Sequence, residues 1–173
     1  AAAAPPGHKV AVPPMPGEPL NATAYCRGTS NAAALASRAA AQAFDVVEVL
    51  RVSSADALPP TRDAVLLKAL VAHGASWGSL ADGLLSRRPD LTEHAAKKDF
   101  LVRWLGYGPI DIGRSLECAA ERAMLIGTGE VGVDQARVFS VPLPPSLAGK
   151  TVWRRLTITL AWLSPVNPSH RAY

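Results

Sequence analysis

The sequence predicts an α/β fragment with several helices, followed by an antiparallel β region with a sandwich-like arrangement. Two short apolar runs precede a long alanine-rich stretch, a pattern that favours strands followed by a helix. After about Glu117 the apolar residues change from helical spacing to alternation. We therefore expect two domains: residues 1–118 would hold the helices and residues 119–173 the β-rich part.

Composition limits the classes of protein that fit this chain. It has 173 residues, of which 49% are apolar and 18% charged, as in a globular protein that buries a core. The net charge is +4, but the basic residues are scattered in short pairs, which disfavours a nucleic-acid surface. No run approaches the roughly 18 uncharged apolar residues of a membrane span, and the N-terminal residues lack a signal-peptide pattern.

The first elements expected are two short strands and a long helix. Residues 10–12 and 22–25 are short apolar runs on either side of a proline-rich loop, Pro13–Pro19. The helix is expected from about Ser30 to about Leu50, because alanine is the best helix former. Small side chains make its first turns thin and uncharged, so we expect the helix start to be buried.

Two further helices follow from caps and apolar spacing. The first spans Thr61–His73, with Asp63 suited to the positive helix start and Gly74 to the C-cap. The next spans Thr92–Leu105 and is closed by Gly106.

The C-terminal third is expected to form strands. Apolar residues alternate with other residues near the end of the chain, at Leu156, Ile158, Leu160 and Trp162. This alternation is typical of a half-buried strand. Residues 123–126 and 138–141 are predicted as further strands. A free-standing sandwich needs more strands than these, so we expect the chain to be an internal piece of a longer protein.

The sequence Gly28-Thr29-Ser30 stands at the start of the long helix. A nucleophilic serine needs a base for its proton and donors for the oxyanion, and a helix N-terminus supplies free N–H groups. Gly28 would also leave room for a substrate backbone. The simpler reading is that Thr29 or Ser30 only caps the helix.

The stretch "GTSNAAALASRAAA" resembles the serine-bearing segment of the subtilisin-like serine peptidases (subtilases), in which Gly-Thr-Ser-x-Ala opens the long central helix. "GYGPID", residues 106–111, is similar to the Gly-x-Gly segment near the end of subtilase catalytic domains. "RRLTITLAWLSPVNPSHRAY" resembles the β-rich region that follows this domain in some bacterial subtilases. Ala34 replaces a usual proline and Arg38 a usual glycine, which indicates a divergent branch.

The resemblance implies that residues 1–118 are the C-terminal part of a catalytic domain and that the intact protein is a serine endopeptidase. Ser30 would be the nucleophile and an oxyanion donor, supported by Thr29 and Gly28. The family's acid, histidine base and oxyanion asparagine would lie upstream, since residues 1–29 contain no aspartate and His8 lies outside a His-Gly-Thr motif. We expect a peptide or protein substrate and no cofactor, and we expect the isolated chain to be inactive.

Two alternatives use the same residues differently. In the α/β-hydrolase order a base would follow the serine, at His73, His94 or His170, but Ala32 replaces the second glycine of Gly-x-Ser-x-Gly. In the second alternative, the chain would be a non-catalytic pseudo-peptidase or an interaction module built on the β region. No His or Cys spacing predicts a metal site.

The two cysteines, Cys26 and Cys118, are far apart in sequence. They fit reduced thiols in a bacterial cytoplasm, and a single disulfide is the alternative. Neither the oligomeric state nor the cleavage specificity follows from the sequence.

Overall fold

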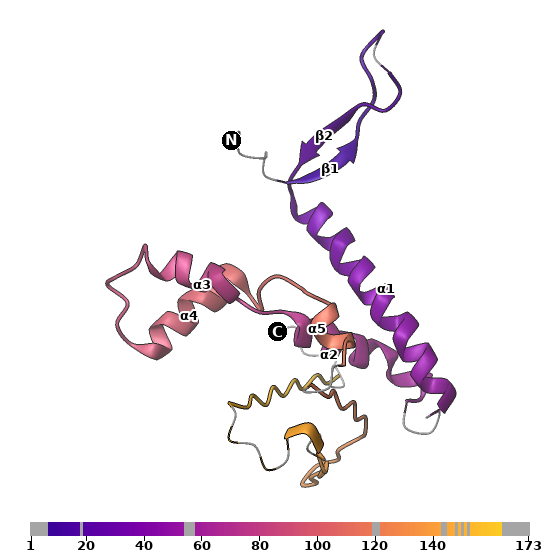
Figure 1. Ribbon diagram of the computed structural model, residues 1–173, viewed down its shortest axis with the longest axis vertical. Coiled ribbons are helices and arrows are strands. Elements are labelled where there is room, and N and C mark those ends of the chain that lie inside the picture. The colour runs from indigo at the N-terminus through magenta and orange to yellow at the C-terminus, as the bar shows by residue number, and fades with distance from the viewer. Residues whose placement is uncertain are drawn as a thin grey trace, which may run out of the picture. The chain divides into compact units, whose positions relative to one another are not determined.

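The chain is mostly helical in the part that the computed structural model describes (Figure 1). The described residues are 7–17, 19–53, 58–118, 122–142, 145–147, 149, 151 and 153–163. They contain five α-helices and, at the N-terminal end, one hairpin of two strands. The predicted α/β fragment with a C-terminal β region is therefore wrong.

The chain divides into two compact units, Ala1–Arg38 and Ala39–Tyr173. This division falls inside the longest helix, α1 (Thr29–Ser53), so each unit contains part of it. The predicted domain boundary between residues 118 and 119 stays a prediction.

The first unit consists of a hairpin and the start of α1. Strand β1 (His8–Ala11) pairs antiparallel with β2 (Thr23–Cys26), with His8 opposite Cys26. The two predicted strands are confirmed, each with a small shift in position. The predicted long helix is confirmed as well, but the alanines of its first turns are exposed rather than buried.

The second unit has a core between the C-terminal half of α1 and helix α2 (Asp63–Gly74), which follows a short 3-10 helix, Pro60–Arg62. Burial of a valine or leucine side chain in such a core stabilises a fold by about 1.5–3 kcal/mol. The buried core residues are Ala43, Val47, Leu58, Leu66 and Leu70. The predicted second helix is thus confirmed, and one of its faces packs on α1, but Gly74 is its last residue and the C-cap is Ala75.

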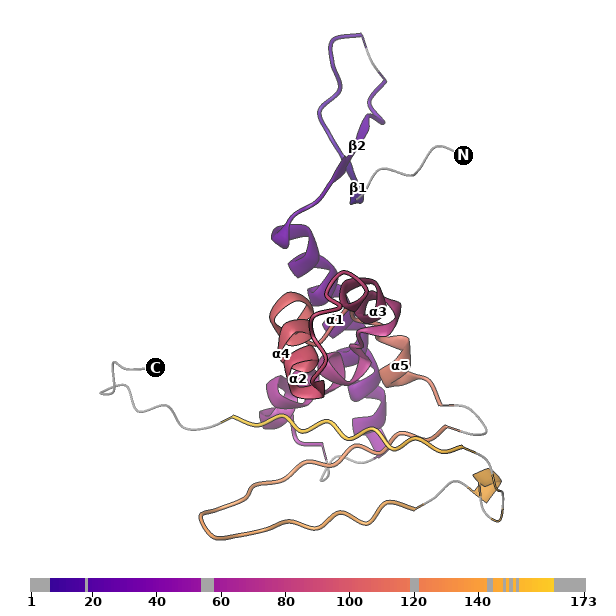
Figure 2. The same ribbon diagram turned by 90° about the vertical axis from the view of Figure 1, so that its left-hand side faces the viewer.

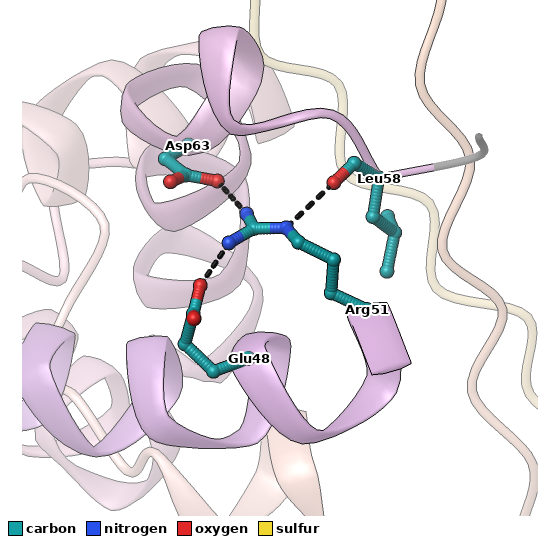
Figure 3. A network of polar contacts seen from close by, with 4 residues as sticks. All are labelled: Glu48, Arg51, Leu58 and Asp63. Carbon is teal, nitrogen blue, oxygen red and sulfur yellow. Dashed lines mark hydrogen bonds and ion pairs between the residues drawn. The ribbon is translucent and has the colours of Figure 1, made fainter. Parts of the chain in front are cut away.

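Arg51 joins the end of α1 to the start of α2 (Figure 3). Its Nε donates to the carbonyl oxygen of Leu58 at 2.7 Å. Its two terminal nitrogens form ion pairs with Glu48 and Asp63. Arg51 lies in the last turn of α1 and Asp63 in the first turn of α2, so both charges suit the helix dipoles.

Three more helices complete the described helical part. Helices α3 (Gly78–Leu85) and α4 (His94–Leu105) pack against each other, and α5 (Gly113–Leu116) packs on α2. Figure 1 and Figure 2 both show α3 and α4 side by side. The predicted third helix is confirmed as α4, whereas the sequence did not predict α3 or α5.

The C-terminal segments contain no strand among residues 122–142 and 151–163 that the structure describes. Figure 2 shows them, in orange and yellow, as irregular chain. Residues 123–126 instead cover the core, where Met124 and Ile126 pack on the buried cluster. The alternating apolar residues near the end of the chain are 64–79% exposed: Leu156, Ile158, Leu160 and Trp162.

The reason for this difference is physical. Alternating apolar residues predict which face of an extended segment prefers burial, but a strand also needs a neighbouring backbone to complete its hydrogen bonds. The described residues supply no such ladder here. The one regular element among residues 122–163 that the structure describes is a 3-10 helix, Pro145–Leu147. The final predicted segment, residues 164–173, lies outside the described part.

Candidate functional site

Ser30 lies in the first turn of α1 and is exposed. The Ala32 N–H donates to the Gly28 carbonyl at 3.2 Å, which is the first hydrogen bond of the helical ladder. The N–H groups of Thr29, Ser30 and Asn31 precede this bond and have no intrahelical acceptor. The hydroxyl of Ser30 therefore stands beside backbone donors that a developing oxyanion requires.

The electrostatic setting of Ser30 favours a negative charge. Helix α1 is 25 residues long and has no acidic residue in its first turn, so no carboxylate of that turn offsets the positive end of the dipole. The first charged side chain after Ser30 is Arg38. A transient anion at Ser30 would thus meet partial positive charge from the helix without competition from a neighbouring carboxylate.

Gly28 leaves the approach to Ser30 open. A Cβ built at this position would meet nothing within 4 Å, and its backbone φ lies outside the left-handed region. The local fold therefore tolerates a larger residue, and packing does not require glycine here. Thr29 is exposed beside it. Both supporting residues lie at the helix start, as the sequence predicts.

The structure describes three of the four histidines, one in the unit that contains Ser30 and two in the other unit. His8 lies in β1, and no hydrogen bond connects it to Ser30 among the described residues. His73 lies in the last turn of α2, and its Nδ1 is 2.9 Å from the Thr159 hydroxyl oxygen. His94 is the exposed first residue of α4, and His170 lies outside the described residues.

The environment of His73 disfavours its protonated form. Partial burial, followed by the positive charges of Arg114 and Arg122, lowers the pKa of His73 below its ordinary value. A neutral ring suits the contact with Thr159, in which one partner donates and the other accepts. This contact joins α2 to residue 159 in the C-terminal part of the chain.

The "GYGPID" segment forms a tight loop against the chain that precedes α3. The backbone φ of Gly108 is +96°, and a Cβ there would lie 2.4 Å from the Ser76 carbonyl oxygen. The Trp77 indole N–H donates to the Gly106 carbonyl at 2.8 Å, and the Ser76 N–H donates to Pro109 at 3.2 Å. Gly108 is therefore required by a close backbone approach that sequence reasoning alone did not identify.

Other chemistry finds little support in the described residues. They contain no group of three His, Cys, Asp or Glu side chains able to hold a metal ion. Cys26 and Cys118 are both exposed free thiols, and they belong to different units. None of the helices described here has both the length and the apolar character needed to cross a membrane.

Comparison of the chain with protein-family models, with curated proteins and with solved structures gives no match.

Proposed function

We propose that Ser30 is the nucleophile of a serine endopeptidase of the subtilisin-like kind. The observation that carries this proposal is the position of Ser30: an exposed hydroxyl in the first turn of a long helix whose N-terminal N–H groups are free. A cap alone would account for the serine. It would not account for the combination of Gly28, Thr29 and an alanine-rich helix that resembles the family's serine segment.

The proposed reaction is acyl transfer. The Ser30 Oγ attacks the peptide carbonyl carbon, while the Ser30 proton passes to a histidine base. The oxyanion is stabilised by the Ser30 N–H and the field of α1. The C–N bond then breaks, the base gives its proton to the leaving amine, and water hydrolyses the ester on Ser30. No cofactor takes part in these steps.

The proposal requires a base, an acid and a second oxyanion donor beyond the side chains that surround Ser30 in the described structure. We therefore expect the 173-residue chain by itself to be inactive. This requirement also separates the proposal from its rival, a non-catalytic pseudo-peptidase in which the same helix start has no base.

The test is covalent labelling of the gene product, as its own cells make it, with a fluorophosphonate. Trypsin releases Gly28–Arg38 as one peptide, "GTSNAAALASR", which contains Ser30 and Ser37. Fragment ions in mass spectrometry distinguish an adduct on one serine from an adduct on the other. We expect the adduct on Ser30 and loss of the label in Ser30→Ala.

Ser37→Ala is the matched control, because Ser37 is an exposed serine on the same helix, two turns later. Labelling in Ser37→Ala should equal that of the unchanged protein. Equal labelling of Ser30→Ala and the unchanged protein would refute the proposal. An absence of labelling in the native protein would favour the pseudo-peptidase.

A further inference from the structure

A cavity open to solvent lies between α3 and α4 in the second unit, and its lining includes none of the residues proposed for catalysis. Its volume is about 360 Å³, within the range of small-molecule sites. Its lining residues are Trp77, Leu85, His94, Lys97, Lys98 and Leu101. Apolar side chains and basic side chains therefore share one concave surface.

The apolar part of the lining offers a site for a hydrocarbon chain. Leu101 is 4% exposed, and Leu85 and Trp77 are half-buried. The indole of Trp77 is held in place by its hydrogen bond to the Gly106 carbonyl. A ring fixed in this way can form an apolar wall without the entropy loss that a free side chain would suffer on binding.

The two lysines of the lining have no carboxylate partner among the described residues. Neither Lys97 nor Lys98 forms an ion pair within the described part of the chain. By contrast, Arg88, in the connection between α3 and α4, is paired with Asp90 at 2.6 Å. Two unpaired ammonium groups at an apolar cavity favour a ligand that brings its own negative charge.

The position of these lysines has an electrostatic cost. They lie in the first two turns of α4, where positive charge opposes the helix dipole, and the exposed N-cap residue Glu93 forms no ion pair with them in the described part of the chain. A carboxylate at the cavity would offset the repulsion. We propose that the α3–α4 cavity binds a medium-chain fatty acid, with the hydrocarbon against Trp77 and Leu101 and the carboxylate at Lys97 and Lys98.

The experiment is a titration of the ¹⁵N-labelled 173-residue chain with decanoate, read from the indole N–H resonance of Trp77. The variant Trp77→Phe assigns that resonance among the four tryptophans. We expect a saturable shift with decanoate. We also expect affinity for decanol to be lower by about tenfold, because the alcohol has the same tail without the charge.

Two kinds of control test the charged and apolar parts separately. The double variant Lys97→Gln/Lys98→Gln should weaken decanoate binding by about tenfold. Lys68→Gln, at an exposed lysine on α2, should leave it unchanged. Acetate should produce no saturable shift, because it carries the charge without the tail.

The proposal is overturned if decanol binds as tightly as decanoate, or if the double variant keeps the affinity while its amide spectrum shows an intact fold. It is also overturned if acetate binds as decanoate does, since the site would then be a simple anion site. Tighter binding of acetyl-Leu-Leu than of decanoate would assign the cavity to a peptide C-terminus and refute the fatty acid.

Discussion

Gly108→Ala tests the most crowded glycine contact of the "GYGPID" loop. The new Cβ would lie 2.4 Å from the Ser76 carbonyl oxygen and 2.9 Å from the Trp77 backbone nitrogen. Both are backbone atoms, so relief requires the chain before α3 to move. This movement would disturb the hydrogen bond from the Ser76 N–H to the Pro109 carbonyl.

The expected magnitude has two parts. A side chain at the positive φ of Gly108 costs about 1–2 kcal/mol, and overpacking against fixed atoms costs about 1–3 kcal/mol. We therefore expect Gly108→Ala to lower the free energy of unfolding by about 2–5 kcal/mol. The measurement is urea denaturation followed by far-ultraviolet circular dichroism.

Gly83→Ala is the matched control, because Gly83 lies within α3 and a Cβ there would meet nothing within 4 Å. Alanine is the better helix former, so this variant should be more stable by about 0.5–1 kcal/mol. A Gly108→Ala variant as stable as the unchanged chain would show that the loop does not approach Ser76 as closely as described.

Two further predictions concern buried or half-buried polar groups. Ser115 is fully buried and donates to the Leu70 carbonyl at 2.7 Å, so Ser115→Ala should lower the free energy of unfolding by about 1 kcal/mol, whereas Ser79→Ala, at an exposed serine, should change it little. The pKa of His73 is lowered in the folded chain, so the unfolded chain binds more protons between that pKa and about pH 6.5. The free energy of unfolding should therefore fall as the pH falls through this window. Thermal unfolding between about pH 7 and about pH 5 should show a smaller loss in His73→Gln than in the unchanged chain or in His94→Gln; equal losses in all three would contradict the assigned environment of His73.

The helical part of the fold followed from local signals that need no partner. Alanine propensity predicted α1, and apolar spacing with an acidic residue near the helix start predicted α2. Helix α3 was missed because it has only eight residues and because Gly83 in its interior lowers its intrinsic propensity by about 1 kcal/mol; it packs against α4. Local sequence alone does not contain that contact.

The predicted strands of the C-terminal part were wrong because strands, unlike helices, depend on residues far away in the sequence. Strand formation depends on a neighbouring backbone, and the alternating residues Leu156–Trp162 carry no information about where one would come from. The candidate site also has one part that local sequence predicts and one part that it does not. The helix start at Ser30 was predictable from Gly28 and the following alanines, whereas a base would have to be placed by tertiary structure.

The contacts of Arg51 restrict which residues can occupy that position. Its Nε, Nη1 and Nη2 each donate to a different acceptor. These acceptors are Leu58 in the connection, Glu48 on α1 and Asp63 on α2. A lysine would keep the positive charge but has one ammonium group in place of the planar fork, so it cannot satisfy all three in this geometry. A substitution that leaves the net charge of the chain unchanged would therefore lose at least one of the contacts that join the end of α1 to the start of α2.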